Sequence, residues 1–169
     1  MIGDRWGVTE DDVARHYPCD EFVAAPVLEA WRGVTVRTTA SSLWPWIGQI
    51  RLAPYSYDWI DNLGRRSPQE LRGLPDPVAG EPFTTAATRR LGRILSVAPG
   101  EQLTARIAGV VISYLLVPQR DVTRLLMKLV TDRGRWVAPL LSAGDLVMAR
   151  RQLLNLKRLA EQASAAPVA

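Results

Sequence analysis

Apolar and polar residues alternate in four successive segments of the second half of the chain, as in half-buried β-strands. The four segments are residues 94–97, 103–107, 110–117 and 122–131. Pro99 and Gly100 stand between the first two, where a type II turn prefers proline and then glycine. Because the connections are this short, neighbouring strands must run antiparallel.

A longer apolar repeat follows near the C-terminus, with the spacing of three and four residues that marks one face of a helix. Its members are Leu146, Ala149, Leu153, Leu156 and Ala160. We expect a helix of roughly 18 residues that begins at about Asp145 and is about 27 Å long, which is enough to cross a whole sheet. Residues 163–169 should form a frayed tail.

The first half of the chain is less regular. Residues 34–36 alternate as a short strand, and residues 41–50 repeat as an amphipathic helix. A second short helix is predicted over residues 55–63, ending at Gly64. Residues 65–90 are rich in proline and are expected to form a long surface loop with at most one short edge strand at 83–85.

The domain organisation follows from this pattern and from a length of 169 residues, which is about one domain. Residues 1–30 should be an irregular arm, in which Thr9 and the three acids after it resemble the start of a helix. Residues 31–162 should form a single domain. We expect no secretory signal, because residues 1–6 include an acid and no basic run.

The order of elements predicts an α+β fold. A sheet built of hairpins must bury one face, and the terminal helix offers the long apolar face that can cover it. We therefore expect a curved antiparallel sheet wrapped around the C-terminal helix, with the two short helices after the first strand closing one end.

Three segments give this order a family resemblance. They are Trp-Pro-Trp-Ile-Gly-Gln-Ile at 44–50, Tyr-Ser-Tyr-Asp-Trp-Ile-Asp-Asn-Leu at 55–63 and Asp-Leu-Val-Met-Ala-Arg-Arg-Gln-Leu-Leu at 145–154. Together they resemble the START-like (SRPBCC) superfamily, and within it an actinobacterial subgroup of polyketide cyclase/dehydratase-like proteins. The resemblance spans about residues 31–161 and implies the helix-grip fold, in which a ligand lies between sheet and helix.

The candidate ligand contacts are aromatic, polar and methionine side chains that this fold would bring near its cavity: Trp46, Tyr55, Tyr57, Asn62, Arg106, Ser113, Met127 and Met148. Aromatic rings combine apolar area with a polar group, but the same rings can instead plug the end of the sheet. An inward Arg106 would anchor an anion, although its strand position also allows it to face solvent. Ser113 and Tyr114 lie on opposite faces of one strand, so one hydroxyl should face the interior.

Three functions remain open at this point. The one we favour is the binding of a small hydrophobic, lipid- or polyketide-like molecule without turnover. The alternatives are an aromatase/cyclase-type enzyme and a non-catalytic interaction module with a filled cavity. The catalytic candidate is Asp58 as a general base, although this residue is equally suited to capping a helix or pairing with an arginine.

Composition and charge limit the classes of binding partner that we expect. The longest mainly apolar run, residues 107–118, is too short for a membrane-spanning helix, which needs about 20 residues. Of the 21 basic residues 19 are arginines, but they are scattered, so the net charge of +4 does not form the basic patch of a nucleic-acid-binding protein. We expect neither nucleic acid nor a membrane span. The pattern leaves the oligomeric state open.

Cofactors and metals are not expected either. His16 and Cys19 are the single histidine and the single cysteine of the sequence, too few for a zinc site or a Ser-His-Asp arrangement. The glycines do not match the spacing of a phosphate-binding loop. A lone cysteine cannot form an internal disulfide, which suits the cytoplasm as the location.

Overall fold

The computed structural model describes residues 4–56, 64, 66–132 and 138–165, and of residues 138–147 it describes the backbone alone. In this part of the chain six strands form the main sheet, in the order β1-β2-β8-β7-β6-β5. Their bounds are Arg5–Trp6 for β1, Leu28–Val36 for β2, Arg93–Ala98 for β5, Gln102–Ile107 for β6, Val110–Gln119 for β7 and Val122–Thr131 for β8. The strands pair antiparallel, except that β1 is parallel to β2.

The four alternating segments are therefore confirmed as β5 to β8, and Gly100 has the positive φ of 80° that a type II turn requires. The strand predicted at 34–36 is longer than its pattern indicated, because β2 already begins at Leu28. Residues 28–33 pair in full register with β8, and both faces of this segment are covered. Because neither face is open to solvent, the segment lacks the apolar/polar alternation by which a half-buried strand is predicted.

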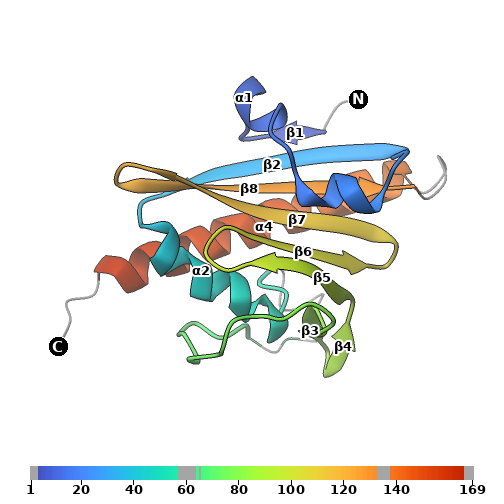
Figure 1. Ribbon diagram of the computed structural model, residues 1–169. Coiled ribbons are helices and arrows are strands. Elements are labelled where there is room, and N and C mark those ends of the chain that lie inside the picture. The colour runs from blue at the N-terminus through green and yellow to red at the C-terminus, as the bar shows by residue number, and fades with distance from the viewer. Residues whose placement is uncertain (1–3, 57–63, 65, 133–137, 166–169) are drawn as a thin grey trace.

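The C-terminal helix α4 (Ala138–Ala165) lies along one face of the sheet, as Figure 1 shows. The predicted apolar face is confirmed for Ala149, Leu153, Leu156 and Ala160, which are all buried in the main core. Leu146 falls among the residues whose side chains are not described. The helix begins seven residues before Asp145, so the prediction of its start was wrong. It continues to Ala165, three residues into the tail predicted to fray, and residues 166–169 lie outside the described part of the chain.

Helix α2 (Ala40–Gly48) continues into the 3₁₀ turn η2 (Gln49–Arg51), which confirms the helix predicted over residues 41–50. The side chain of Thr39 caps α2 by accepting a hydrogen bond from the amide of Ser42 at 3.2 Å. In Figure 1, α2 lies below the sheet, on the same side as the hairpin of β3 (Thr84–Ala86) and β4 (Arg89–Leu91). The second predicted helix, at 55–63, falls almost entirely outside the described residues.

The Pro-rich segment forms a loop in its described part, and the short edge strand predicted at 83–85 is found as β3. β3 pairs with β4 in a separate two-stranded sheet, and β4 was missed because its exposed residues do not alternate. Gly92, with a φ of 68°, joins β4 to β5. A Cβ atom at this position would lie 2.6 Å from the carbonyl oxygen of Arg106, so glycine is required here.

The N-terminal segment is ordered, unlike the irregular arm that we predicted. After β1 it forms α1 (Glu10–Val13) and η1 (Pro18–Phe22). The predicted helix start is confirmed by a capping box between Thr9 and Asp12. Tyr17, Cys19 and Val23 then pack against the sheet face opposite α4, in a second buried cluster whose sheet residues are Val111, Leu126 and Val130.

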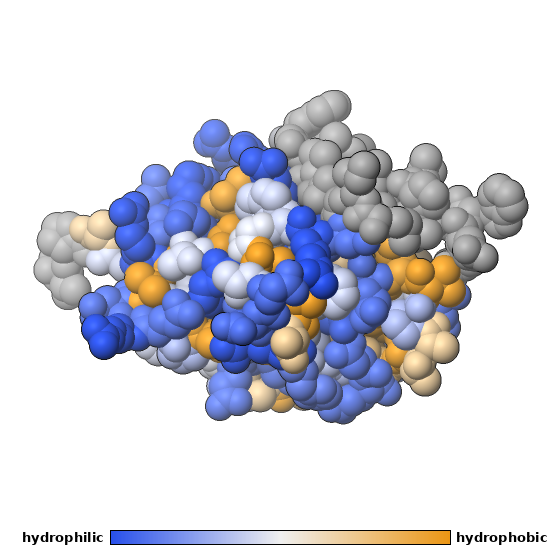
Figure 2. Space-filling view, turned by 90° about the horizontal axis from the view of Figure 1, so that it is seen from above, coloured by the Kyte–Doolittle hydropathy of each residue, from blue (hydrophilic) through white to orange (hydrophobic). Residues whose placement is uncertain are grey.

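Charged and polar groups fasten this arm to the outer face of the sheet. The Lys128 ammonium lies 2.6 Å from Asp20 and 2.8 Å from Glu29, while Arg124 lies 2.5 Å from Asp12. Burial alone would lower the pKa of Lys128, but the two carboxylates outweigh it and raise that pKa. Burial also raises the pKa of the Cys19 thiol to about 11, which makes this cysteine unreactive. Seen from above the view of Figure 1, the surface that is not drawn in grey is mostly hydrophilic, with small hydrophobic patches between (Figure 2).

Candidate functional site

A cavity of about 140 Å³ lies between the inner face of the sheet and α4, and we call it the inner cavity. Strands β6, β7 and β8 form one wall, α4 forms another, and residues near 54 and 83 close it. Its lining consists of Pro54, Ser56, Phe83, Thr84, Ile107, Ile112, Tyr114, Met127, Leu129, Met148, Ala149 and Gln152. Most of these side chains are apolar, as is usual for pockets that hold small molecules.

Two polar side chains of the inner cavity, Tyr114 and Gln152, are held in a short chain of hydrogen bonds. The Tyr114 hydroxyl donates to Oε1 of Gln152 at 2.7 Å, and Nε2 of Gln152 donates to the carbonyl of Pro54 at 2.6 Å. Both side chains are at least nine-tenths buried. These hydrogen bonds fix one polar edge in a mainly apolar cavity, and pockets of this kind orient a ligand through such groups.

A further cavity of about 380 Å³, which we call the arginine-rimmed cavity, lies beside the C-terminal half of α4. Its described lining consists of Tyr55, Ser56, Gly64, Arg66, Ser67, Gln69, Arg151, Asn155, Arg158 and Leu159. Three of these residues are arginines, and none of the described lining residues is acidic. Its polar lining contrasts with the apolar lining of the inner cavity.

The segment Pro54–Ser56 separates the two cavities. Nδ2 of Asn155 donates to the carbonyls of Tyr55 at 2.9 Å and Ser56 at 3.3 Å, so α4 holds this segment in place. Tyr55 has a φ of 56°, in the left-handed region, and its hydroxyl accepts a hydrogen bond from Gln49 at 2.6 Å. Among the described residues, Ser56 is the one that lines both cavities.

The structure brings some of the predicted contacts to these cavities. Met127 and Met148 line the inner cavity, and Tyr55 lines the arginine-rimmed cavity. As ligand contacts all three stay predictions. Tyr57, Asn62 and the catalytic candidate Asp58 lie outside the described residues.

The other predicted contacts lie elsewhere. Trp46 is 1% exposed and packs in the main core without lining either cavity, and its buried indole nitrogen has no hydrogen-bond partner in the described part of the chain. Arg106 faces solvent and donates to the carbonyl of Phe22 at 3.5 Å. Ser113 faces the arm, and its hydroxyl oxygen accepts a hydrogen bond from the backbone amide of Cys19 at 2.8 Å. Its neighbour Tyr114 is the one that faces the cavity.

Gln152 and Asn155 are two of the site residues that the sequence reasoning missed. Both lie beside the apolar face of α4, where they read as ordinary polar helix positions. Their positions could have been noticed, because Gln152 and Asn155 are three residues apart and each directly precedes a leucine of the apolar face, Leu153 or Leu156. This spacing places two amides at the border of the buried face.

The comparisons with known proteins bear on the fold. No family model and no curated protein matches the chain. Among solved structures, protein NE0264 from Nitrosomonas europaea has a TM-score of 0.56 at 12% identity, over 82% of this chain and 97% of that one. The AHSA1-like protein from Aeromonas hydrophila has a TM-score of 0.50 at 14% identity, over 82% of this chain and 97% of that one. The polyketide cyclase-like protein Cgl2372 from Corynebacterium glutamicum has a TM-score of 0.50 at 12% identity, over 81% and 93% of the two chains.

The chain has the helix-grip fold of these AHSA1-like and polyketide cyclase-like proteins. Identities this low show the helix-grip fold alone and leave the ligand open. Within its described residues, this helix-grip protein has no helix with an apolar stretch long enough to cross a bilayer. The same residues contain no group of three or more His, Cys, Asp or Glu placed to hold a metal ion.

Proposed function

We propose that this protein binds a small hydrophobic molecule in the inner cavity, between the sheet and α4. The observation that supports this best is the cavity itself, about 140 Å³ in volume and lined mainly by apolar side chains. An apolar cavity of about 150 Å³ can hold one benzene-sized group. The volume therefore favours a ligand whose buried part is a single ring or a short branched chain.

The same observation favours binding over a filled interaction module. A filled module would leave no space beyond that of a few waters, whereas this cavity approaches the volume of a small organic ring. Met127 and Met148 are flexible wall residues that adapt to the outline of a guest.

Binding without turnover is also favoured over a cyclase-type reaction. Such a reaction needs an acid and a base positioned in the cavity. The described lining offers the Tyr114 hydroxyl as a proton donor, and this hydroxyl already donates to Gln152 at 2.7 Å. That arrangement suits the orientation of a ligand better than the transfer of a proton.

The test is to fill the cavity and measure binding. Ala149 is 6% exposed and lines the cavity, so Ala149→Leu places three further carbons inside it. The matched control is Ala163→Leu, the same change at an exposed position of the same helix. With phenylbutanol as the probe in calorimetric titrations, we expect Ala149→Leu to weaken binding by about tenfold or more, which corresponds to about 1.4 kcal/mol.

Circular dichroism and thermal melting of both variants would show that they remain folded, since overpacking costs about 1–3 kcal/mol. Native mass spectrometry after mixing the protein with cell extract would then identify the natural guest. Equal affinity of the two variants for phenylbutanol, or no binding by the unmodified protein, would contradict the proposal.

A further inference from the structure

We infer that Gln152 recognises the polar end of the ligand, by donating one amide hydrogen to a carbonyl oxygen that the ligand carries next to an aromatic ring. This inference rests on the proposed function and adds the chemical class of the ligand and the residue that recognises it. It is carried by the hydrogen bonds of Gln152, by its burial and by the aromatic rings on the wall of the inner cavity.

The orientation of the Gln152 amide follows from its partners. The backbone carbonyl of Pro54 can only accept, so the amide atom that lies 2.6 Å from it must be the nitrogen Nε2. Oε1 then faces Tyr114 and accepts the hydrogen of its hydroxyl at 2.7 Å. A primary amide nitrogen carries two hydrogens. Pro54 takes one of them, and no residue in the described part of the chain accepts the other.

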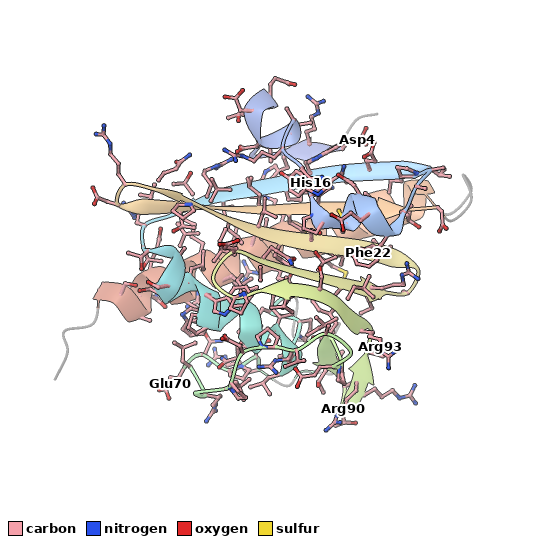
Figure 3. All side chains as sticks on the ribbon, viewed as in Figure 1. Asp4, His16, Phe22, Glu70, Arg90 and Arg93 are labelled. Carbon is pink, nitrogen blue, oxygen red and sulfur yellow. The ribbon has the colours of Figure 1, made fainter. Side chains whose placement is uncertain are left out.

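The other buried glutamine of the described residues uses its amide fully. Gln49 is 1% exposed, and its Nε2 donates both to the Tyr55 hydroxyl at 2.6 Å and to the carbonyl of Glu70 at 2.9 Å. Its Oε1 accepts from the backbone amide of Arg72 at 2.7 Å. Glu70 is labelled at the lower left of Figure 3, on the loop beneath α2. Gln152, which is 8% exposed, thus keeps a donor that a buried amide normally uses inside the protein.

Gln152 lines the inner cavity, where an unused N–H favours a guest that can accept it. A buried N–H without an acceptor is costly, whereas an unused lone pair on an oxygen is tolerated more often. The hydroxyls of Thr84 and Tyr114 do not compete, because Thr84 donates to the carbonyl of Ile50 at 2.8 Å and Tyr114 donates to Gln152. The group that suits the N–H best is an acceptor without a hydrogen of its own, such as a carbonyl oxygen.

Two rings on the cavity wall indicate the apolar part of the guest. The rings of Phe83 and Tyr114 have centroids 6.2 Å apart and planes tilted by 35°. A further ring adds to such a pair in an offset or edge-to-face arrangement, and the thioethers of Met127 and Met148 make favourable contacts with aromatic rings. Because the hydroxyl of Tyr114 contacts Gln152, the aromatic wall and the amide adjoin. The carbonyl of the guest must therefore lie close to its ring.

The experiment compares two probes of the same shape. Acetophenone carries a carbonyl oxygen next to a phenyl ring, and α-methylstyrene has a methylene group in place of that oxygen. Gln152→Met keeps the length of the side chain and removes the N–H. In calorimetric titrations we expect this variant to bind acetophenone about five- to tenfold more weakly than the unmodified protein does. It should bind α-methylstyrene at least as tightly as before.

Two controls separate recognition of the ligand from a structural role of Gln152. Tyr114→Phe breaks the same hydrogen bond to Oε1 but leaves Nε2 and its hydrogens in place, so the ratio of the two affinities should stay as in the unmodified protein. Gln162→Met makes the same substitution at an exposed position of α4 and should change neither affinity. An equal loss of affinity for both probes in Gln152→Met would overturn the inference. So would a ratio that changes as much in Tyr114→Phe as in Gln152→Met.

A measurement on the unmodified protein tests the same bond even if Gln152→Met does not fold. In carbon NMR spectra, acetophenone labelled at its carbonyl carbon should resonate downfield of its position in cyclohexane when it is bound, because an accepted hydrogen bond withdraws electron density from that carbon. Binding of both probes with the carbonyl signal at its cyclohexane position would overturn the inference and leave the proposed function standing. Binding of neither probe would refute the proposed function together with the inference.

Discussion

Replacing Leu153 by alanine tests whether the sheet holds α4 in the way the fold requires. Leu153 is 0% exposed and lies in the main core, on the face of α4 that meets the sheet. The change removes three carbons, which loses about 2.4 kcal/mol at roughly 0.8 kcal/mol for each buried methylene. A void of about 80 Å³ that does not collapse would add about 2 kcal/mol at 24 cal/mol per Å³.

We therefore expect Leu153→Ala to lower the free energy of unfolding by about 2–4 kcal/mol. For a chain of this length each kcal/mol shifts the Tm by about 2–4 °C, so the loss in Tm should be roughly 4–16 °C. Urea denaturation followed by circular dichroism gives the free energy directly, provided that the slope with urea concentration is unchanged.

The neighbouring Leu154 supplies the control, because it is 36% exposed on the same helix. Leu154→Ala makes the same chemical change with almost the same effect on helix propensity. It should cost less than about 1 kcal/mol, as is usual for a substitution away from the core. Similar losses for the two variants would refute the reasoning, because burial of one face of α4 could not then explain its stability.

Two further predictions concern the arm on the outer face of the sheet. Lys128→Met leaves the carboxylates of Asp20 and Glu29 without their cation and should cost about 1–3 kcal/mol, because both carboxylates are partly solvated; urea denaturation that finds the variant neutral or more stable would contradict this. For Asp12, burial raises the pKa, but hydrogen bonds from Thr9 and the Arg124 guanidinium outweigh it and leave the pKa below its ordinary value of 3.8. The ionised carboxylate then stabilises the fold above pH 3.8, and this contribution is lost as the pH falls through the lowered pKa. Asp12→Asn should therefore be less stable than the unmodified protein near pH 6, by a margin that shrinks below about pH 4, and a margin independent of pH would contradict the assignment.

The fold was largely predictable from local pattern. Leu125, Met127 and Leu129 alternate with neighbours that face the arm, and the structure places these three in the main core. The apolar face of α4 was equally clear from its spacing. What the pattern missed was the first part of β2, where both faces are covered, and the arm, whose packing depends on residues about a hundred positions away.

The candidate site was less predictable, because it depends on which of two neighbouring side chains faces inward. Ser113 and Tyr114 were placed on opposite faces correctly, but Ser113 was chosen as the ligand contact and Tyr114 faces the cavity. Trp46 was chosen for its ring, and it packs in the core instead. The arginine-rimmed cavity joins Arg66 to Arg158, and no local spacing relates residues that far apart in the sequence.

The arm on the outer face has a consequence for how the chain is made. Cys19 bonds to Ser113 across 94 positions, Asp20 to Lys128 across 108, and Gly7 to Arg124 across 117. A ribosome adds about 5–20 residues per second, so roughly 5–20 s pass between synthesis of the arm and synthesis of its partners. During that interval Tyr17 and Val23 have no strands to pack against. The arm is thus synthesised well before the strands that it contacts in the native fold.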